Sequence, residues 1–204
     1  LLGNVNRMQG RLPESLTYYE KCLEVNPDSA VAYSGLAGAY FELDDLQAAE
    51  QNARKALSLD DSVPSMHFTL ASIHEAEGDL QQAAAEYLKE IEVTPEDIGS
   101  HFNLAMIYRV VGRVAEEERQ LQRVLEINPE YPRGLLFMAR IYLNRGENYA
   151  RAVEMVTAAV AEPLETQDLA LGYFLLADLH NRLGDPVKSR EYAAKAQSLV
   201  SRSP

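Results

Sequence analysis

Apolar residues recur along this chain at the spacing of amphipathic helices. In one stretch, His101, Leu104, Ala105 and Tyr108 stand at i, i+3, i+4 and i+7, which places them on one face of a helix. Stretches of this kind alternate with short breaks that contain Gly, Asp or Pro, the residues that end helices and form turns. The pattern predicts short helices joined in antiparallel pairs, and we therefore expect an all-α fold.

The helical pattern repeats at a fixed interval, which is the mark of a repeat architecture. The apolar-Ala pair of the first helix begins at positions 36, 70, 104 and 138, so that each step is 34 residues, and another copy begins at 176. Turn glycines recur between the two helices of a copy, and Asp44-Asp45 takes their place once. The predicted organisation is one array over 1–204, made of a partial repeat 1–29, repeats 30–63, 64–97, 98–131, 132–166 and 167–200, and a tail 201–204.

Small residues complete the pattern in the second helix of each copy, at Ala49, Ala83, Ala152 and Ser189. With them, residues 1–200 resemble the tetratricopeptide repeat family. The resemblance implies a right-handed superhelical solenoid of antiparallel helix hairpins, whose first helices line a concave groove. It also implies a non-catalytic scaffold or adaptor that binds another protein or peptide. Glu117 departs from the family pattern because it stands where a small residue is expected, which predicts looser helix packing at that point.

The resemblance assigns a partner-binding role to the face of the first helices that would line the groove. Phe68, Phe102 and Phe174 share one register and would be aromatic anchors, while three arginines would supply local positive charge, as in many interface hot spots. Each Phe could instead fill space between neighbouring helices, and each Arg could be ordinary solvated charge. The predicted groove residues are Phe41, Phe68, Glu75, Phe102, Met106, Arg109, Arg133, Leu136, Arg140, Phe174 and Asp178.

The same register argues against the carboxylate clamp with which some members of the family hold the C-terminus of a chaperone. Phe68, Ser72 and Phe137 occupy positions where the clamp needs Lys, Asn and Arg. We expect instead an extended or helical segment of a partner, with apolar side chains that meet the phenylalanines and acidic ones that meet the arginines.

Composition and charge narrow the classes of ligand. A net charge of −12 repels phosphate backbones, and the chain has no basic stripe, so we expect no nucleic acid partner. The sequence has no apolar stretch of the roughly 18 residues that a membrane span needs, so we expect no membrane insertion. Cys22 is the one cysteine; it falls at a small packing position and is predicted to be an inert core thiol. The compartment stays undetermined.

Candidate catalytic and metal-binding residues are few. The four histidines stand at core positions of the repeat and make no ligand pair, so we expect no metal, no cofactor, no catalytic residue and no enzyme. The chain begins at Leu1 within a repeat, which indicates a fragment or a processed product. One alternative is therefore the regulatory or substrate-docking region of a larger enzyme whose catalytic domain lies outside this chain. Another is self-association through the terminal repeats.

Overall fold

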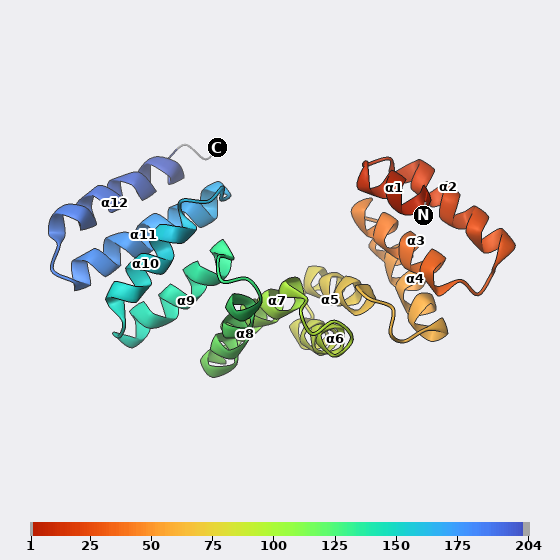
Figure 1. The fold of residues 1–204 in the computed structure, drawn as a ribbon, viewed down its shortest axis with the longest axis horizontal. Coiled ribbons are helices and arrows are strands. Elements are labelled where there is room, and N and C mark those ends of the chain that lie inside the picture. Colours follow the sequence, from red (N-terminus) through yellow and green to blue (C-terminus); the bar gives the residue numbers. More distant parts are fainter. Residues whose placement is uncertain (1, 202–204) are drawn as a thin grey trace. The chain divides into compact units, whose positions relative to one another are not determined.

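The regular secondary structure of residues 2–201, which the computed structural model describes, is entirely α-helical (Figure 1). This confirms the predicted all-α class. The helices in chain order are α1 (Leu2–Met8), α2 (Leu12–Val25), α3 (Ala30–Glu42), α4 (Leu46–Leu59), α5 (Met66–Glu77), α6 (Leu80–Val93), α7 (Ile98–Val110), α8 (Val114–Ile127), α9 (Pro132–Arg145), α10 (Tyr149–Ala159), α11 (Thr166–Arg182) and α12 (Pro186–Val200).

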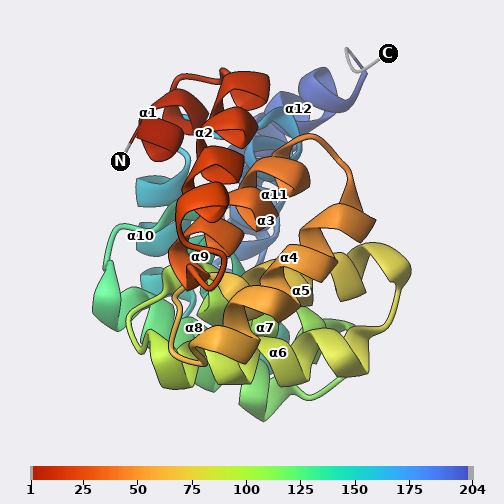
Figure 2. The ribbon, with the colours of Figure 1, turned by 90° about the vertical axis from the view of Figure 1, so that its right-hand side faces the viewer.

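The chain divides into two compact units, residues 1–107 and 108–204, with the division inside α7. In unit 1, α1 pairs with α2, α3 with α4 and α5 with α6, and each hairpin packs on the next, as Figure 2 shows for α1 to α4. In unit 2, α9 pairs with α10 and α11 with α12. Consecutive hairpins therefore bury their apolar faces against one another, as expected for helices that cannot cover those faces alone.

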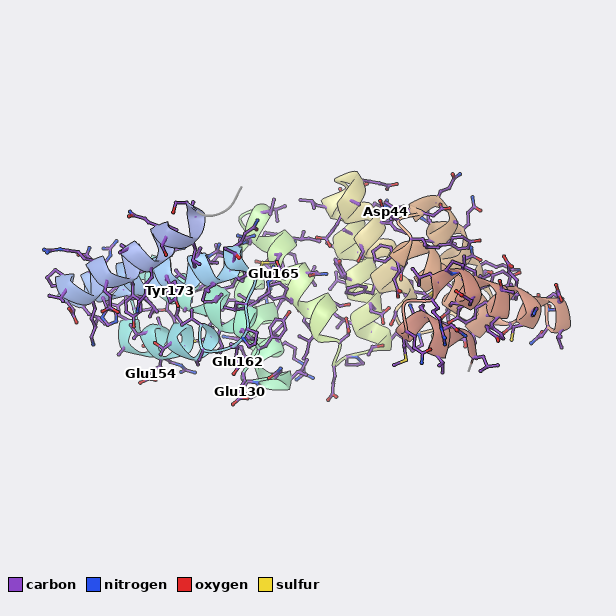
Figure 3. All side chains as sticks on the ribbon, turned by 90° about the horizontal axis from the view of Figure 1, so that it is seen from above. Asp44, Glu130, Glu154, Glu162, Glu165 and Tyr173 are labelled. Atoms are coloured by element: carbon purple, nitrogen blue, oxygen red, sulfur yellow. The ribbon has the colours of Figure 1, made fainter. Side chains whose placement is uncertain are left out.

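The turn between the two helices of a hairpin is built from two adjacent residues. The first adopts a positive φ, which is +81° at Gly78 and +61° at Asp44, the residue labelled in Figure 3. Where the second is an aspartate, it caps the next helix: the side chain of Asp79 accepts a hydrogen bond from the Gln82 N–H at 3.0 Å, whereas Arg11 and Arg113 at the same place make no side-chain cap. Asp45 caps α4 in the same way. The Gly-Asp pair thus ends one helix and begins the next.

Small side chains let the paired helices approach closely. Alanines on the inner faces of the second helices have no exposed surface, and Leu-Ala or Met-Ala pairs of the first helices pack against them. The fully buried alanines of α4, α6, α10 and α12 are Ala49, Ala53, Ala56, Ala83, Ala152, Ala159 and Ala196. Ala49, Ala83 and Ala152 stand at the positions where the repeat pattern places small residues, so the sequence determines how closely the helices pack.

In unit 1, a tyrosine of α2 lies between two glycines of the first helices. The ring of Tyr19 packs against Gly3 of α1 and Gly35 of α3, and its hydroxyl donates to Asn4 Oδ1 at 2.5 Å. A Cβ at Gly3 would lie 2.5 Å from the ring, and a Cβ at Gly35 would overlap it. Only glycine therefore leaves room for this aromatic ring.

Two buried glutamates of α6 tie that helix to the start of α5. Glu90 accepts hydrogen bonds from the backbone N–H groups of Ser65 at 2.8 Å and Phe68 at 3.2 Å. It replaces a side-chain cap, because Ser65 has a φ of +67° and makes no cap itself. Glu86 lies 2.6 Å from His67 Nδ1 and 2.7 Å from Lys89 Nζ. Burial opposes ionisation of Glu86, but the hydrogen bonds from Lys89 and His67 outweigh it and lower its pKa.

Candidate functional site

The first helices of the hairpins carry all of the predicted binding residues. We call the face of these helices that bears them the A-helix surface of each unit. In unit 1, Phe68, Ser72 and Glu75 stand at i, i+4 and i+7 of α5, on one side of that helix. All three are intermediate in exposure. This part of the A-helix surface is therefore a row of partly accessible side chains with an aromatic and an acidic member.

A buried tyrosine holds that row in place. The Tyr87 hydroxyl donates to Glu75 Oε2 at 2.5 Å and accepts from Asn103 Nδ2 at 2.9 Å. Its ring meets Phe68 edge-on, with the ring centroids 5.5 Å apart. Burial of the phenol raises the pKa of Tyr87, and the hydrogen bond to Glu75 raises it further, so the hydroxyl stays protonated and keeps donating. Phe68, Glu75 and Asn103 are thereby held in one network.

A small cleft of about 150 Å³ lies on the same surface, lined by residues of α1, α3 and α5. Ser34 and Gly38 line it, and Arg7 reaches across Gly38 to pair with Glu42 at 3.2 Å. The predicted groove residue Phe41 lies on α3, half-buried. The two glycines of α3, Gly35 and Gly38, make room for side chains of α2 and α1.

In unit 2, two arginines converge on one aromatic ring. The guanidinium carbons of Arg109 and Arg140 lie 4.9 Å and 5.0 Å from the centroid of Phe137. Arg140 also pairs with Glu117, its Nη2 lying 2.8 Å from Glu117 Oε1. The carboxylate that stands in place of a small residue is thus buried against an arginine of the next helix.

Burial works against both charges of this ion pair. It raises the pKa of Glu117, although Arg140 and Arg109 oppose the shift. It likewise lowers the pKa of Arg140, with Glu117 opposing and the nearby charge of Arg109 adding to the shift. Arg140 Nε is buried without a hydrogen-bond partner among the described residues. Arg140 and Glu117 thus form a partly buried ion pair, and the charge of Arg109 lies near enough to act on both without pairing with the carboxylate.

The other predicted residues of unit 2 lie on α9 and α11. Arg133 pairs with Asp168 at 3.1 Å and keeps 46% of its side chain exposed. Phe174 is 45% exposed, and Asp178 follows it one turn later on α11, also exposed. Figure 3 labels Tyr173, which precedes Phe174 and stacks on Tyr192 of α12 with ring centroids 6.1 Å apart. Phe174 is thus accessible on a helix whose neighbouring tyrosine is fixed by packing.

Two of the predicted groove residues are not accessible. Phe102 is 2% exposed, and Leu136 is fully buried among the apolar side chains of α9, α10 and α11. The expectation that they present a surface to a partner is wrong, and for Phe102 the alternative of filling space between neighbouring helices agrees with its burial. Met106 is half-buried. On a helix, adjacent residues are separated by roughly 100°, so positions at the edge of a face become interior when a neighbouring helix covers them.

Sequence reasoning missed the residues that organise the A-helix surfaces. Tyr87 belongs to a second helix and is not among the predicted groove residues. The positions spaced by 34 residues around it are Tyr19, Ala53, Tyr87 and Leu121, so a tyrosine recurs at this place in the repeat. Phe137 was considered only as a departure from the clamp. The repeat pattern does not indicate that two arginines meet on its ring, because Arg109 reaches it from α7, whereas Arg140 lies on α9 with Phe137.

The residues considered for catalysis make structural contacts. His101 is buried and lies 3.1 Å from the Pro95 carbonyl, and His180 stacks on Tyr192 with centroids 5.5 Å apart. Residues 2–201 contain no group of three or more acidic, His or Cys side chains that could hold a metal ion. The prediction for Cys22 is wrong in one respect, because the thiol is exposed on α2 rather than buried in the core.

Two further features of residues 2–201 bear on partners. None of the helices within residues 2–201 is both long and apolar enough to cross a membrane. In unit 1, a cavity of about 550 Å³ is lined by α1, α2 and the start of α3, and Val25 and Val31 beside it are 88% and 70% exposed. Self-association through such a terminal face stays a prediction.

Comparisons with known proteins agree with the fold. Family models described as "Tetratricopeptide repeat" match residues 1–62 and residues 68–132 and 136–204. No curated protein matches the chain. Among solved structures, PilF of Pseudomonas aeruginosa shares 20% identity with a TM-score of 0.83, covering 99% of this chain and 90% of PilF.

Two other solved structures are also similar. PilW, described as a widely conserved type IV pilus biogenesis factor, shares 20% identity with a TM-score of 0.75, covering 99% of this chain and 92% of PilW. YrrB, described as a TPR protein with an unusual peptide-binding site, shares 17% identity with a TM-score of 0.73, covering 90% of this chain and 93% of YrrB. At these identities the likeness establishes a common fold of helix hairpins.

Proposed function

Because the chain belongs to the tetratricopeptide repeat family, whose members generally mediate protein–protein interactions, we propose that it is a scaffold that binds a segment of a partner protein on its A-helix surfaces. Family and fold are typical of non-catalytic scaffolds, and a binding role accounts for the accessible aromatic, acidic and basic side chains without a reaction.

The observation that carries the proposal is the accessible aromatic of α11. A phenylalanine that is 45% exposed contributes little to the stability of unit 2, while it offers a partner a large apolar contact beside the carboxylate of Asp178. Aromatic residues are enriched among the side chains that dominate binding energy. Phe174 is therefore the anchor that we assign to the partner.

The network of unit 1 supports the same function. Phe68 and Glu75 are already held by Tyr87, so binding would cost little side-chain entropy at either residue. An aromatic edge next to a fixed carboxylate suits a segment with an apolar side chain followed by a hydrogen-bond donor. The fold shared with YrrB, described as peptide-binding, supports this class of ligand but not its sequence.

Site-specific photo-crosslinking tests the proposal. A photoreactive phenylalanine analogue would replace Phe174 in one variant and Leu88 of α6 in the other, because these side chains are 45% and 43% exposed and so equally accessible. We expect discrete crosslinks to a protein of the source cells from position 174, lost on competition with unlabelled chain. Equal crosslinking from position 88, or none from 174, would refute binding at the A-helix surface.

Alanine variants give the matched control. Phe174→Ala should weaken capture of the crosslinked protein at least tenfold and leave the helical circular dichroism unchanged, since the side chain packs little. Leu88→Ala, which removes a similarly exposed apolar side chain from a second helix, should leave capture unchanged.

A further inference from the structure

The convergence of two arginines on Phe137 bears on what the partner carries. We infer that Arg109 and Arg140 form a binding site for one carboxylate, supplied by an acidic side chain of the partner segment. The inference rests on the proposed function and names the chemistry that unit 2 recognises.

Charge is the first argument. Arg140 and Arg109 bring two positive charges to the Phe137 ring, and Glu117 brings one negative charge, at 2.8 Å from Arg140. Within the part of the chain that the structure describes, no carboxylate pairs with Arg109, whereas Arg113, Arg133 and Arg145 all have such partners. One positive charge is left over, and a single carboxylate balances it.

Position is the second argument. Arg109 is exposed at the end of α7, while the contact of its guanidinium with Phe137 limits the freedom of a long side chain. A guanidinium held in place before the ligand arrives loses less entropy per hydrogen bond formed. Glu117, by contrast, is 4% exposed and cannot turn outward to neutralise Arg109. The donor is therefore both accessible and preorganised.

Arg151, another arginine without an ion pair in the described part of the chain, lacks these features. Arg151 of α10 is exposed, and in residues 2–201 it makes no ion pair and no contact with an aromatic ring. It is ordinary solvated charge and serves as the control.

A phosphate group would bring close to two negative charges, more than the single uncompensated positive charge of the site. The charge balance therefore favours a carboxylate as the ligand.

The test uses the whole chain and two defined probes, the acetylated and amidated tetrapeptides of glutamate and of glutamine. Nuclear magnetic resonance of arginine Nε–H groups at physiological salt would report the binding. We expect the glutamate probe to shift the Arg109 and Arg140 signals and the glutamine probe to leave them unchanged. The chain's net charge of −12 disfavours non-specific attraction of the acidic probe, so a saturable shift reports the site.

Variants complete the test. Arg109→Ala should weaken binding of the glutamate probe at least tenfold. Arg109→Lys should weaken it several-fold, because lysine lacks the planar guanidinium, and Arg151→Ala should leave it unchanged. Equal shifts from both probes, or an equal loss in Arg151→Ala, would overturn the inference. If the glutamate probe does not bind while crosslinking from position 174 persists, the carboxylate site is refuted and the scaffold function is retained. If the probe binds but crosslinking from position 174 is absent, partner binding at the A-helix surface is refuted and the carboxylate site is retained.

Discussion

Replacing Gly35 with alanine should destabilise unit 1, although alanine is the better helix former. The new Cβ would overlap the ring of Tyr19, which is 5% exposed and packs against Gly3 on its other side. The ring cannot withdraw without breaking its hydrogen bond to Asn4. Overpacking of a buried site costs about 1–3 kcal/mol, and alanine in a helix returns roughly 0.5–1 kcal/mol. The difference is a net loss of up to about 2.5 kcal/mol, and we expect roughly 1 kcal/mol.

Gly38→Ala is the matched control on the same helix. Its Cβ would meet Arg7 Nη1, the far end of a flexible side chain that is 36% exposed, so the arginine can swing aside. This variant should range from neutral to about 1 kcal/mol more stable, because only the helix propensity changes.

Urea unfolding followed by circular dichroism at the helical band suits this chain, which has no tryptophan. Because repeat arrays can unfold in parts, hydrogen exchange of α3 amides should be measured alongside. Faster exchange in α3 of Gly35→Ala is expected, and adding Tyr19→Leu should relieve most of the loss. The reasoning fails if Gly35→Ala is as stable as the wild type, or if Gly38→Ala loses as much.

Two further predictions concern the turns and the buried carboxylates. Asp44→Gly should stabilise unit 1 by about 0.5–1 kcal/mol in the same urea assay, because the residue has a φ of +61° and its exposed side chain makes no hydrogen bond or ion pair in the described structure. Glu86 has a lowered pKa, so the stability it contributes is present above the ordinary Glu pKa of about 4.3 and is lost as pH falls through its folded value. In Glu86→Gln the free energy of unfolding should therefore fall less steeply with decreasing pH below that value. Urea unfolding curves at several acidic pH values measure this, and the same pH dependence in the variant and the wild type would contradict the role of Glu86.

The helices could be predicted from sequence because their signals are local. A 3.6-residue period, a turn glycine and a capping aspartate all act within one hairpin, as at Gly78 and Asp79, and the 34-residue repeat multiplies each signal. Positions near the edge of a helix face were predicted less well. Phe102 and Phe174 occupy one register, yet one is 2% and the other 45% exposed, since exposure depends on the neighbouring helix.

The pairing of charges was harder still to predict, because it joins different helices. The sequence shows that Glu117 stands at a repeat position where other copies have a small residue, and that Arg140 is a basic residue of the next helix. That they form one ion pair requires the packing of α8 against α9. The same holds for Arg133 and Asp168, which lie on α9 and α11.

The cost of the Glu117–Arg140 pair is the reason to connect it with function. Burying two charges often stabilises a protein less than apolar side chains of the same volume would. At the equivalent positions of the other second helices, small residues such as Ala83 and Ala152 pack with no exposed surface. Unit 2 instead keeps a carboxylate whose burial raises its pKa and an arginine whose Nε has no partner in the described structure. This arrangement lowers the stability of unit 2. A function in binding explains it, because Arg109, the second arginine on the Phe137 ring, would bind a carboxylate of the partner.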